Sequence, residues 1–407
     1  MASSKAKAMT SEARRPRIPI VDARTATILL LAAVFALVVI GAVMVFSATS
    51  ATLSSAGKNP FDEMAQQLGF VGIGVLFMLM LWFAIPYKAL MGGNLLWGYY
   101  IACMVLLLLT FFVGTEVNGA KRWLYIGPIG FQPSEFIKIA LLLMTIRIMY
   151  DSSVGAINQR AGLSQFLVLV AIPLAFMLFT QSDLGTVAIC FVGIFAVLWL
   201  GGMPGKWLAI IGGVTVVGGL IMVFGVGYRS SRLVFLNPWD DGEGGLGYGY
   251  NIIHAYYAIA EGGLFGQGIG SSSEKYGYLF ASDSDFIFAI IAEELGMVGC
   301  VVVIGLFLVI LYAGLRIAME CPDGFGKMVA GGFAIMLVFQ AFLNIGCTIG
   351  VFPTTGKPLP FISSGGSSVI SSLMIVGMIL SVGRSTDEAH DPKRQRDKLR
   401  VVRNAQR

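Results

Sequence analysis

Four charged residues stand where the sequence offers few other charges. Glu135 precedes Lys138 by three positions, so the two side chains share one face of a helix. Asp183 lies in a short polar turn, and Asp285 opens a long apolar run. A carboxylate within reach of a lysine has a pKa that its surroundings can tune, as general acid–base catalysis requires. These residues are candidates for proton-transfer chemistry.

Each candidate also has a structural interpretation. Glu135 and Lys138 can form an ion pair that only fixes helix packing, although ionisable residues inside a membrane are functional by default. Asp183 and Asp285 can each cap the helix that follows them. Both interpretations stay open from the sequence.

The amino-acid composition indicates whether these residues belong to a soluble protein or to a membrane protein. Of the 407 residues, 56% are hydrophobic and only 13% are charged, about half the share that a soluble domain carries. The mean hydropathy is +0.80. A soluble, disordered or coiled-coil protein is excluded, and a net charge of +5 does not fit a basic nucleic-acid-binding module. The five cysteines lack metal-ligand spacing and are interpreted as apolar packing residues.

Apolar stretches of membrane-crossing length predict an all-α polytopic membrane protein of about ten transmembrane helices. The first stretch is too long for the apolar part of a signal peptide, so it is interpreted as a retained span. The predicted spans are 26–47, 68–85, 93–113, 135–150, 164–181, 185–201, 207–227, 295–317, 328–350 and 366–383.

The distribution of Lys and Arg predicts the orientation. Most of the 28 basic residues fall in the two tails and in the loops on the same side of the membrane as the N-terminus. Because basic residues are retained on the cytoplasmic side, both termini are predicted to be cytoplasmic. The predicted domains are an N-terminal tail (1–25), a membrane domain (26–384) and a basic C-terminal tail (385–407). We expect the C-terminal tail to lie near anionic lipid, with partner docking as the alternative.

Two predicted extracytoplasmic loops are long, Gly114–Ser134 and Tyr228–Ser284. The second, between spans seven and eight, is rich in aromatic residues, which favours a structured loop over a disordered connector. Within it, 252–259 could form an interfacial amphipathic helix. The glycine-rich segments 242–249 and 262–270 are interpreted as turns and not as phosphate-binding loops, because no strand precedes them.

Four sequence blocks carry a resemblance to a known family. The chain resembles the SEDS (shape, elongation, division and sporulation) family of bacterial cell-wall polymerases, over about residues 25–385, and its division branch more than its elongation branch. Ser182, Ser284, Ser364 and Asn251 depart from the family pattern. The matching blocks are 119–124 with 132–138, 183–186, 285–289 with 293–296, and 355–363 with 365–368.

The resemblance implies a peptidoglycan glycosyltransferase that polymerises lipid II at the outer face of the bacterial cytoplasmic membrane, during septal wall synthesis in cell division. In the reaction that the resemblance implies, the 4-hydroxyl of the acceptor's N-acetylglucosamine attacks the anomeric carbon of N-acetylmuramic acid on a polyprenyl diphosphate donor. Asp285 matches the essential aspartate of the family and would be the general base. Glu135 and Lys138 would support it.

Substrate binding is assigned to residues predicted on the outer side. Cations would stabilise the diphosphate, with Lys138 favoured, and Mg²⁺ or Mn²⁺ is a further possibility for which no carboxylate cage is visible. Trp123 could stack on a sugar or anchor at the membrane interface. The substrate-binding candidates are Lys121, Arg122, Trp123, Asp183, Arg229, Arg232 and Lys275.

The expected partners are lipid II, the growing strand, membrane lipid, a class B penicillin-binding protein (an FtsI-like transpeptidase) and other division proteins, with no nucleic acid. Two other functions compete with the enzyme. A lipid II flippase would need polar groups through the depth of the bilayer, whereas these charges cluster at one end. A non-catalytic division scaffold would need neither Asp285 nor Lys138.

Overall fold

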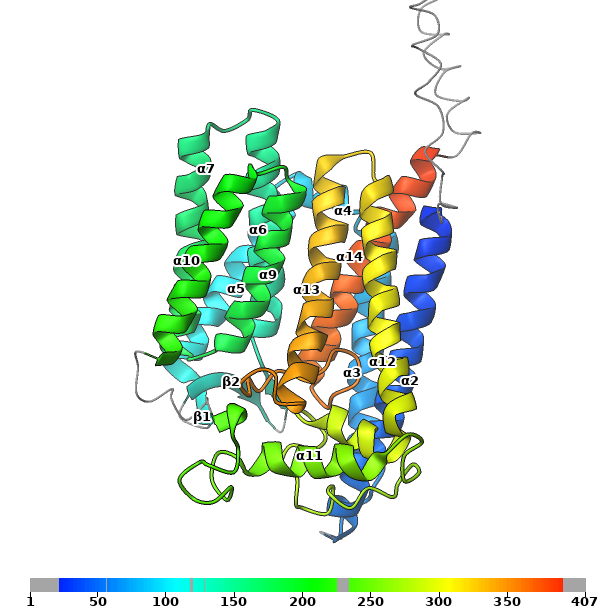
Figure 1. The fold of residues 1–407 in the computed structure, drawn as a ribbon. Helices are drawn as coiled ribbons and strands as arrows, with labels where there is room; N and C mark the ends of the chain where they lie inside the picture. Colours follow the sequence, from blue (N-terminus) through cyan, green and yellow to red (C-terminus); the bar gives the residue numbers. More distant parts are fainter. Residues whose placement is uncertain (1–21, 56, 118–119, 128, 225–233, 391–407) are drawn as a thin grey trace, which may run out of the picture.

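The computed structural model describes residues 22–55, 57–117, 120–127, 129–224 and 234–390. It is a bundle of helices with a small sheet and one transverse helix at one end (Figure 1). The helices are α2 (Ala23–Ser55), α3 (Asp62–Leu79), α4 (Tyr87–Met91), α5 (Asn94–Val113), α6 (Ser134–Ser153), α7 (Gln159–Phe166), α8 (Ile172–Thr180), α9 (Leu184–Leu200), α10 (Gly205–Phe224), α11 (Tyr250–Gly262), α12 (Ile287–Glu320), α13 (Gly324–Thr348) and α14 (Gly366–His390). Two π-helical turns, η1 (Met80–Ala84) and η2 (Leu167–Ala171), continue α3 and join α7 to α8.

Every predicted span falls on one helix or on consecutive helical segments: 68–85 lies on α3 and η1, and 164–181 lies on α7, η2 and α8. Residues 225–227 of the seventh span lie outside the described residues. Seven helices in the described part are long and apolar enough to cross a membrane, and α9 and the first part of α10 are shorter apolar helices. Helix α6 carries four charged residues along its length. The predicted class, a polytopic helical membrane protein, is confirmed, and the number of ten spans stays a prediction.

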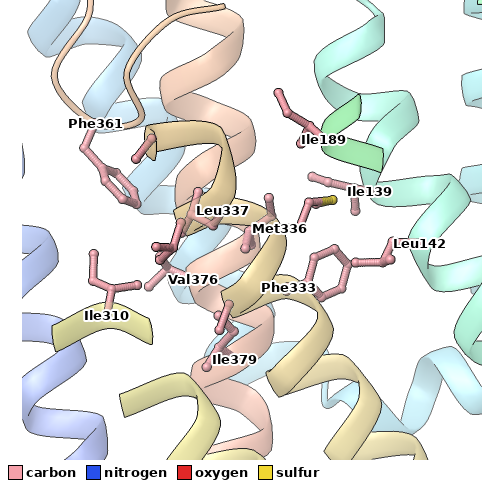
Figure 2. Packing of buried hydrophobic residues seen from close by; sticks show 14 of the residues in the cluster. Ile139, Leu142, Ile189, Ile310, Phe333, Met336, Leu337, Phe361, Val376 and Ile379 are labelled. Atoms are coloured by element: carbon pink, nitrogen blue, oxygen red, sulfur yellow. The ribbon is translucent and has the colours of Figure 1, made fainter. Parts of the chain in front are cut away.

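The core is built around α13 and α14. Within the most apolar window of each helix, 83% of the residues are buried, against 17% in α3. Figure 2 shows side chains of α13 meeting those of α6 and α9 on one side and those of α12 and α14 on the other; the labelled residues of these helices are Ile139, Leu142, Ile189, Ile310, Phe333, Met336, Leu337, Val376 and Ile379. This central pair gives the site a rigid wall.

The first long outer loop folds into a three-stranded antiparallel sheet, which the all-α prediction lacked. Its strands are β1 (Thr115–Val117), β2 (Ala120–Ile126) and β3 (Ile129–Phe131), in that order across the sheet. Residues of β2 alternate between the two faces, so Arg122 points opposite to Lys121 and Trp123. The search for long apolar runs cannot detect such short strands.

Helix α12 is broken at Gly296, which has φ 66° and ψ −166°. The break falls one residue after Leu295, where the membrane-crossing part is predicted to begin. The glycine-rich segment 262–270 fills it: Gln267 and Gly268 donate their N–H groups to the carbonyl oxygens of Glu293 (2.9 Å) and Glu294 (3.0 Å). Backbone groups that a break leaves unpaired must find partners when buried. The segment 262–270 therefore has a structural role, because it provides hydrogen-bond partners for α12 at the break.

The second long loop is structured in its described part. Helix α11 lies across the end of the bundle that carries the sheet (Figure 1) and buries Ile252, Ala255 and Ala258. Its apolar face packs against α12, not against lipid. Before it, the carboxylate of Asp241 accepts N–H groups from Glu243, Gly245, Gly247 and Gly249 at 2.8–3.1 Å. The backbone N–H groups of segment 242–249 thus surround the carboxylate of Asp241 in a ring.

Candidate active site

Asp285 lies in the turn that leads into α12, two residues before the helix begins. The N-cap of α12 is Phe286, so Asp285 is not the residue that caps this helix. Its side chain is only partly exposed and lies against the backbone of Gly356, where an added β-carbon would be 3.5 Å from Oδ2. A β-carbon at position 356 would therefore be in ordinary van der Waals contact with the carboxylate, while the φ of 65° at this position favours glycine.

Three hydrogen bonds hold this turn from one side. The carbonyl oxygens of Asp283, Ser284 and Asp285 accept, respectively, the N–H of Ser364 (2.8 Å), the hydroxyl of Ser363 (2.6 Å) and the amide of Asn344 (2.8 Å). Three successive residues are thereby fixed to α13 and to the loop before α14. The position of the candidate base is set by the core and not by its own loop.

Lys357 reaches the same region from the loop between α13 and α14. Its ammonium forms an ion pair with Asp183 (2.8 Å), and both side chains are 1% exposed. Asp183 also caps α9, because its carboxylate accepts the N–H of Thr186 (3.1 Å). The capping and ionic roles of Asp183 therefore coexist. Gly185 makes room for the lysine, since a β-carbon there would be 2.6 Å from Cγ of Lys357.

Arg122 of β2 is half-buried and turns towards the start of α9. It donates hydrogen bonds to the carbonyl oxygens of Gln181 (2.7 Å) and Ser182 (2.9 Å). Ser182 has φ 50°, a conformation that few non-glycine residues adopt. Arg122 thus braces the turn that presents Asp183.

The pKa values of the two outer carboxylates differ in direction. Burial raises the pKa of Asp285 to about 6, and the neighbouring Asp283 adds to this, whereas Lys357 and Arg122 act against it. Burial also raises the pKa of Asp183, but Lys357 and Arg122 outweigh that effect and hold its pKa below the ordinary value. Asp183 is therefore a permanent anion, and Asp285 is poised to exchange a proton near neutral pH.

Glu135 and Lys138 form the ion pair that their spacing predicts, at 2.5 Å and with both side chains 1% exposed. Lys138 also donates to Gln340 (2.6 Å), whose amide donates to the carbonyl oxygen of Pro358 (3.1 Å), next to Lys357. Cys190 of α9 lies within electrostatic reach of both lysines, Glu135 and Asp183. The two ion pairs therefore belong to one cluster.

This cluster contains buried polar atoms without a partner among the described residues. They are Oγ of Ser134, Oε1 of Glu135, both amide atoms of Gln181 and Oδ1 of Asn344. Unpaired buried polar atoms are rare in proteins and are costly unless something binds them. The described residues therefore leave several donors and acceptors of this cluster without partners.

The remaining predicted site residues lie elsewhere. Lys275 is 2% exposed and pairs with Glu294 at 3.0 Å, with the hydroxyl of Ser47 at 3.1 Å from the same ammonium. Lys121 is exposed on the sheet, and the indole of Trp123 packs over Gly130. Arg229 and Arg232 lie outside the described residues. The part of the chain that the structure describes holds no group of three or more His, Cys, Asp or Glu that could bind a metal ion.

Lys357, Asn344 and Gln340 are site residues that the sequence analysis missed as such. Lys357 is the one charged residue of a matching block, 355–363 with 365–368, which is a signal that the sequence offers. Its partner Asp183, however, is 174 positions away. Asn344 and Gln340 are spaced four residues apart on α13, so they share one face of that helix. Two uncharged polar residues at this spacing in an apolar span were the detectable signal.

Comparison with known proteins identifies relatives over almost the whole chain. The model of the FtsW/RodA/SpoVE family, described as cell cycle proteins, matches residues 27–388. Stage V sporulation protein E of Bacillus subtilis is 35% identical over 351 residues, covering 86% of this chain and 94% of that protein. A probable peptidoglycan glycosyltransferase FtsW of Halothiobacillus neapolitanus is 36% identical over 384 residues, covering 91% and 90%.

Solved structures agree with this. A chain from a structure titled "Structural coordination of polymerization and crosslinking by a peptidoglycan synthase complex" superposes with a TM-score of 0.69 at 29% identity, covering 88% of this chain and 97% of that one. The rod shape determining protein RodA of Thermus thermophilus gives a TM-score of 0.63 at 29% identity, covering 88% and 96%. The chain is a membrane-integral bacterial protein that belongs to the FtsW/RodA/SpoVE family, the SEDS family that its sequence blocks indicate.

Proposed function

We propose that this protein is a peptidoglycan glycosyltransferase that polymerises lipid II at the outer face of the cytoplasmic membrane during division. One observation carries the proposal: Asp285, a partly exposed carboxylate with a pKa of about 6, lies in a rigid turn beside Lys357 and Arg122. Relatives with the name probable peptidoglycan glycosyltransferase FtsW support the substrate class.

The proposed step is a single displacement. Asp285 accepts the proton of the acceptor hydroxyl, and that oxygen forms a bond to the anomeric carbon of the donor sugar. The bond from this carbon to the diphosphate oxygen breaks, and the polyprenyl diphosphate leaves with the electron pair. A base with a pKa near the working pH suits such a transfer, because it is mostly ionised and yet basic enough to take the proton.

The leaving diphosphate gains negative charge, which nearby cations stabilise. We assign this to Lys357 and Arg122, the two cations that act electrostatically on Asp285. Asp183 would hold the ammonium of Lys357 in place, and Glu135 would do the same for Lys138. The unpaired amide of Gln181 would bind a polar group of the substrate.

The charge pattern and the arrangement of the helices support the proposed orientation. Helix α2 begins and α14 ends at one end of the bundle, opposite the sheet and α11 (Figure 1). Lys88 in α4 and Arg160 in α7 are basic residues of the predicted cytoplasmic loops. Both termini would then be cytoplasmic and Asp285 extracytoplasmic. A single-cysteine variant at Lys121, labelled in intact cells by a membrane-impermeant thiol reagent, tests this.

The proposed partner is a class B penicillin-binding protein at the division septum, which would crosslink the strands that this enzyme makes. The support is the similarity to a chain of a peptidoglycan synthase complex. Co-purification of the tagged full-length protein with the transpeptidase of the same cell tests the pairing.

The test of the function compares wild type with Asp285→Asn in proteoliposomes that contain lipid II and the transpeptidase. We expect glycan polymer from wild type and a loss of at least about 10²-fold in the variant, the usual contribution of a general base. Asp241→Asn is the matched control, because this aspartate lies in the outer loop and is held by backbone groups alone. Transport of lipid II without polymer would contradict the proposal in favour of a flippase, and binding of the transpeptidase with neither activity would favour a scaffold.

A further inference from the structure

The outward side of α11 carries a line of ring side chains. Tyr250, His254 and Tyr257 follow one another at spacings of four and three residues, so they share one face of the helix. Three of the residues that α11 buries, Ile252, Ala255 and Gly262, lie on the other side of the helix. The line of rings therefore points away from the helices that would lie in lipid.

Two rings from the segment that follows α11 extend this surface. The ring of Tyr278 stacks on that of His254 with centroids 6.0 Å apart, and the ring of Phe280 contacts Tyr250 at 5.5 Å. His254 in turn lies 4.2 Å from Tyr250. Tyr278 is 56% exposed and Phe280 61% exposed. We call these five residues, Tyr250, His254, Tyr257, Tyr278 and Phe280, the aromatic platform.

The platform contains no Lys or Arg. Its one histidine, His254, is held by the carboxylate of Glu274 at 2.7 Å from Nδ1. The nearest lysine in the sequence, Lys275, is turned away into its ion pair with Glu294. Such a surface does not attract phosphates or anionic lipid headgroups, because both need positive charge. It offers apolar ring faces together with tyrosine hydroxyls that donate and accept hydrogen bonds.

A short segment of the chain connects the platform to the candidate active site. Phe280 precedes Asp285 by five residues, so their Cα atoms are separated by at most about 18 Å. The connecting turn is fixed, since the N–H groups of Ser284 and Phe286 both donate to the carbonyl oxygen of Ala281 at 3.1 Å. A polymer of a few sugar units that starts at Asp285 is long enough to reach the rings.

We infer that the aromatic platform binds the glycan strand, with the C–H faces of the sugar rings stacked on Tyr278, Phe280 and Tyr257. The inference rests on the proposed function and names the place where the strand is held between additions. An uncharged glycan fits the platform because it combines apolar ring faces with hydroxyl groups, as the platform does. The platform then contributes to processivity rather than to the chemical step.

The test uses the purified full-length protein in nanodiscs and two readouts. Binding of a chitin hexasaccharide, a soluble β-linked glycan without diphosphate or lipid, is measured by saturation-transfer NMR. The length distribution of the glycan made from lipid II is measured together with the initial rate. The variants are Tyr278→Ala/Phe280→Ala and Tyr257→Ala. Tyr276→Ala is the matched control, because Tyr276 is 66% exposed in the same segment but is not a platform residue.

We expect wild type and the control to bind the oligosaccharide, and the double variant to bind at least tenfold more weakly. The double variant should make strands several-fold shorter at an initial rate within about twofold of wild type. Unchanged oligosaccharide binding and strand length in the double variant would overturn the inference. Loss of transpeptidase co-purification with unchanged oligosaccharide binding would also overturn it and would identify the platform as a protein-docking surface.

Failure of the proposed function gives a different result. A wild-type protein that makes no polymer under any condition contradicts the glycosyltransferase, while the NMR signal still tests the platform by itself. Since the three substituted side chains, Tyr257, Tyr278 and Phe280, are 47%, 56% and 61% exposed, we expect the variants to keep the melting temperature of wild type, which a thermal shift measurement verifies.

Discussion

Two buried lysine–carboxylate networks lie towards the end of the bundle that carries the sheet and α11, and they differ in completeness. In the first, Lys275 pairs with Glu294, and Ser47 and Ser272 donate to the same carboxylate. In the second, Lys357 pairs with Asp183 beside a partly exposed Asp285. In the described residues, the side chains of the first network all have hydrogen-bond partners, and we call this network closed. The second network is surrounded by unpaired polar atoms.

The difference separates a structural role from a catalytic one. A fully satisfied buried network rigidifies the elements it joins, here the outer loop, α2 and α12. An incompletely satisfied network is destabilising by itself and persists where a ligand or a reaction uses its free groups. Burial and charge alone do not distinguish the two networks; the count of remaining donors and acceptors does.

The largest effect after loss of Asp285 should come from Lys357→Met. The substitution removes a cation that we assign to the leaving diphosphate, so we expect kcat to fall by about 10²–10³, as when one stabilising donor is lost from a transition state. It also leaves Asp183 buried without its partner, which costs about 3–5 kcal/mol in stability. Polymer formation and thermal unfolding measure the two effects.

The double variant Lys357→Met/Asp183→Asn separates these effects. We expect it to recover most of the stability, because no unpaired charge is left, and to remain inactive. Recovery of activity along with stability would show that Lys357 is only structural.

The next effect concerns Asn344, whose amide donates to the carbonyl oxygens of both Asp285 and Lys357 at 2.8 Å. It fixes the distance between the candidate base and the candidate cation. Asn344→Ala should lower kcat by about 10²-fold, the cost of a displacement of roughly 1 Å at a reacting group. The KM for lipid II should change little. A change in KM alone would argue against a positioning role.

A smaller effect follows from pH. Asp285 must be ionised to accept a proton, so activity should fall tenfold per pH unit below about pH 6. Asp283→Asn removes a negative charge that raises this pKa, so the acid limb should move to lower pH. An unmoved limb would assign the titration to another group.

The same pKa shift has a consequence for stability. The pKa of Asp285 is higher in the folded protein than in the unfolded chain, so the native state binds more protons between about pH 4 and pH 6. The free energy of unfolding should therefore decrease as pH rises through that range. Asp285→Asn should remove this component. Chemical denaturation of the detergent-solubilised protein at several pH values measures it.

The smallest effect on activity should come from the closed network. Lys275→Met alone leaves Glu294 buried and unpaired, which should destabilise the protein by about 3–5 kcal/mol. Lys275→Met/Glu294→Gln should restore stability, with polymerisation within about tenfold of wild type. This outcome is opposite to that of the Lys357/Asp183 pair. Loss of polymerisation in a stable double variant would place Lys275 at the substrate, where the sequence analysis placed it.

The sequence predicted the helices and part of the site because both leave local signals. Apolar runs of fixed length located the spans, and the spacing of Glu135 and Lys138 predicted their ion pair. Lys357 escaped because its role depends on a partner from a distant turn. Lys275 was assigned to phosphate because its burial against Glu294 depends on the break in α12, which no local pattern reveals. The sheet escaped because its strands are short.

The ring of backbone donors around Asp241 gives the outer loop a built-in ligand. Its N–H groups lower the pKa of that carboxylate to about 2, so the anion stays in place at any physiological pH. Because the carboxylate is tethered beside its own receptor, its effective concentration exceeds that of any free anion. The N–H groups of this loop are therefore already occupied by the carboxylate of Asp241. They are not free to bind a phosphate from outside the chain.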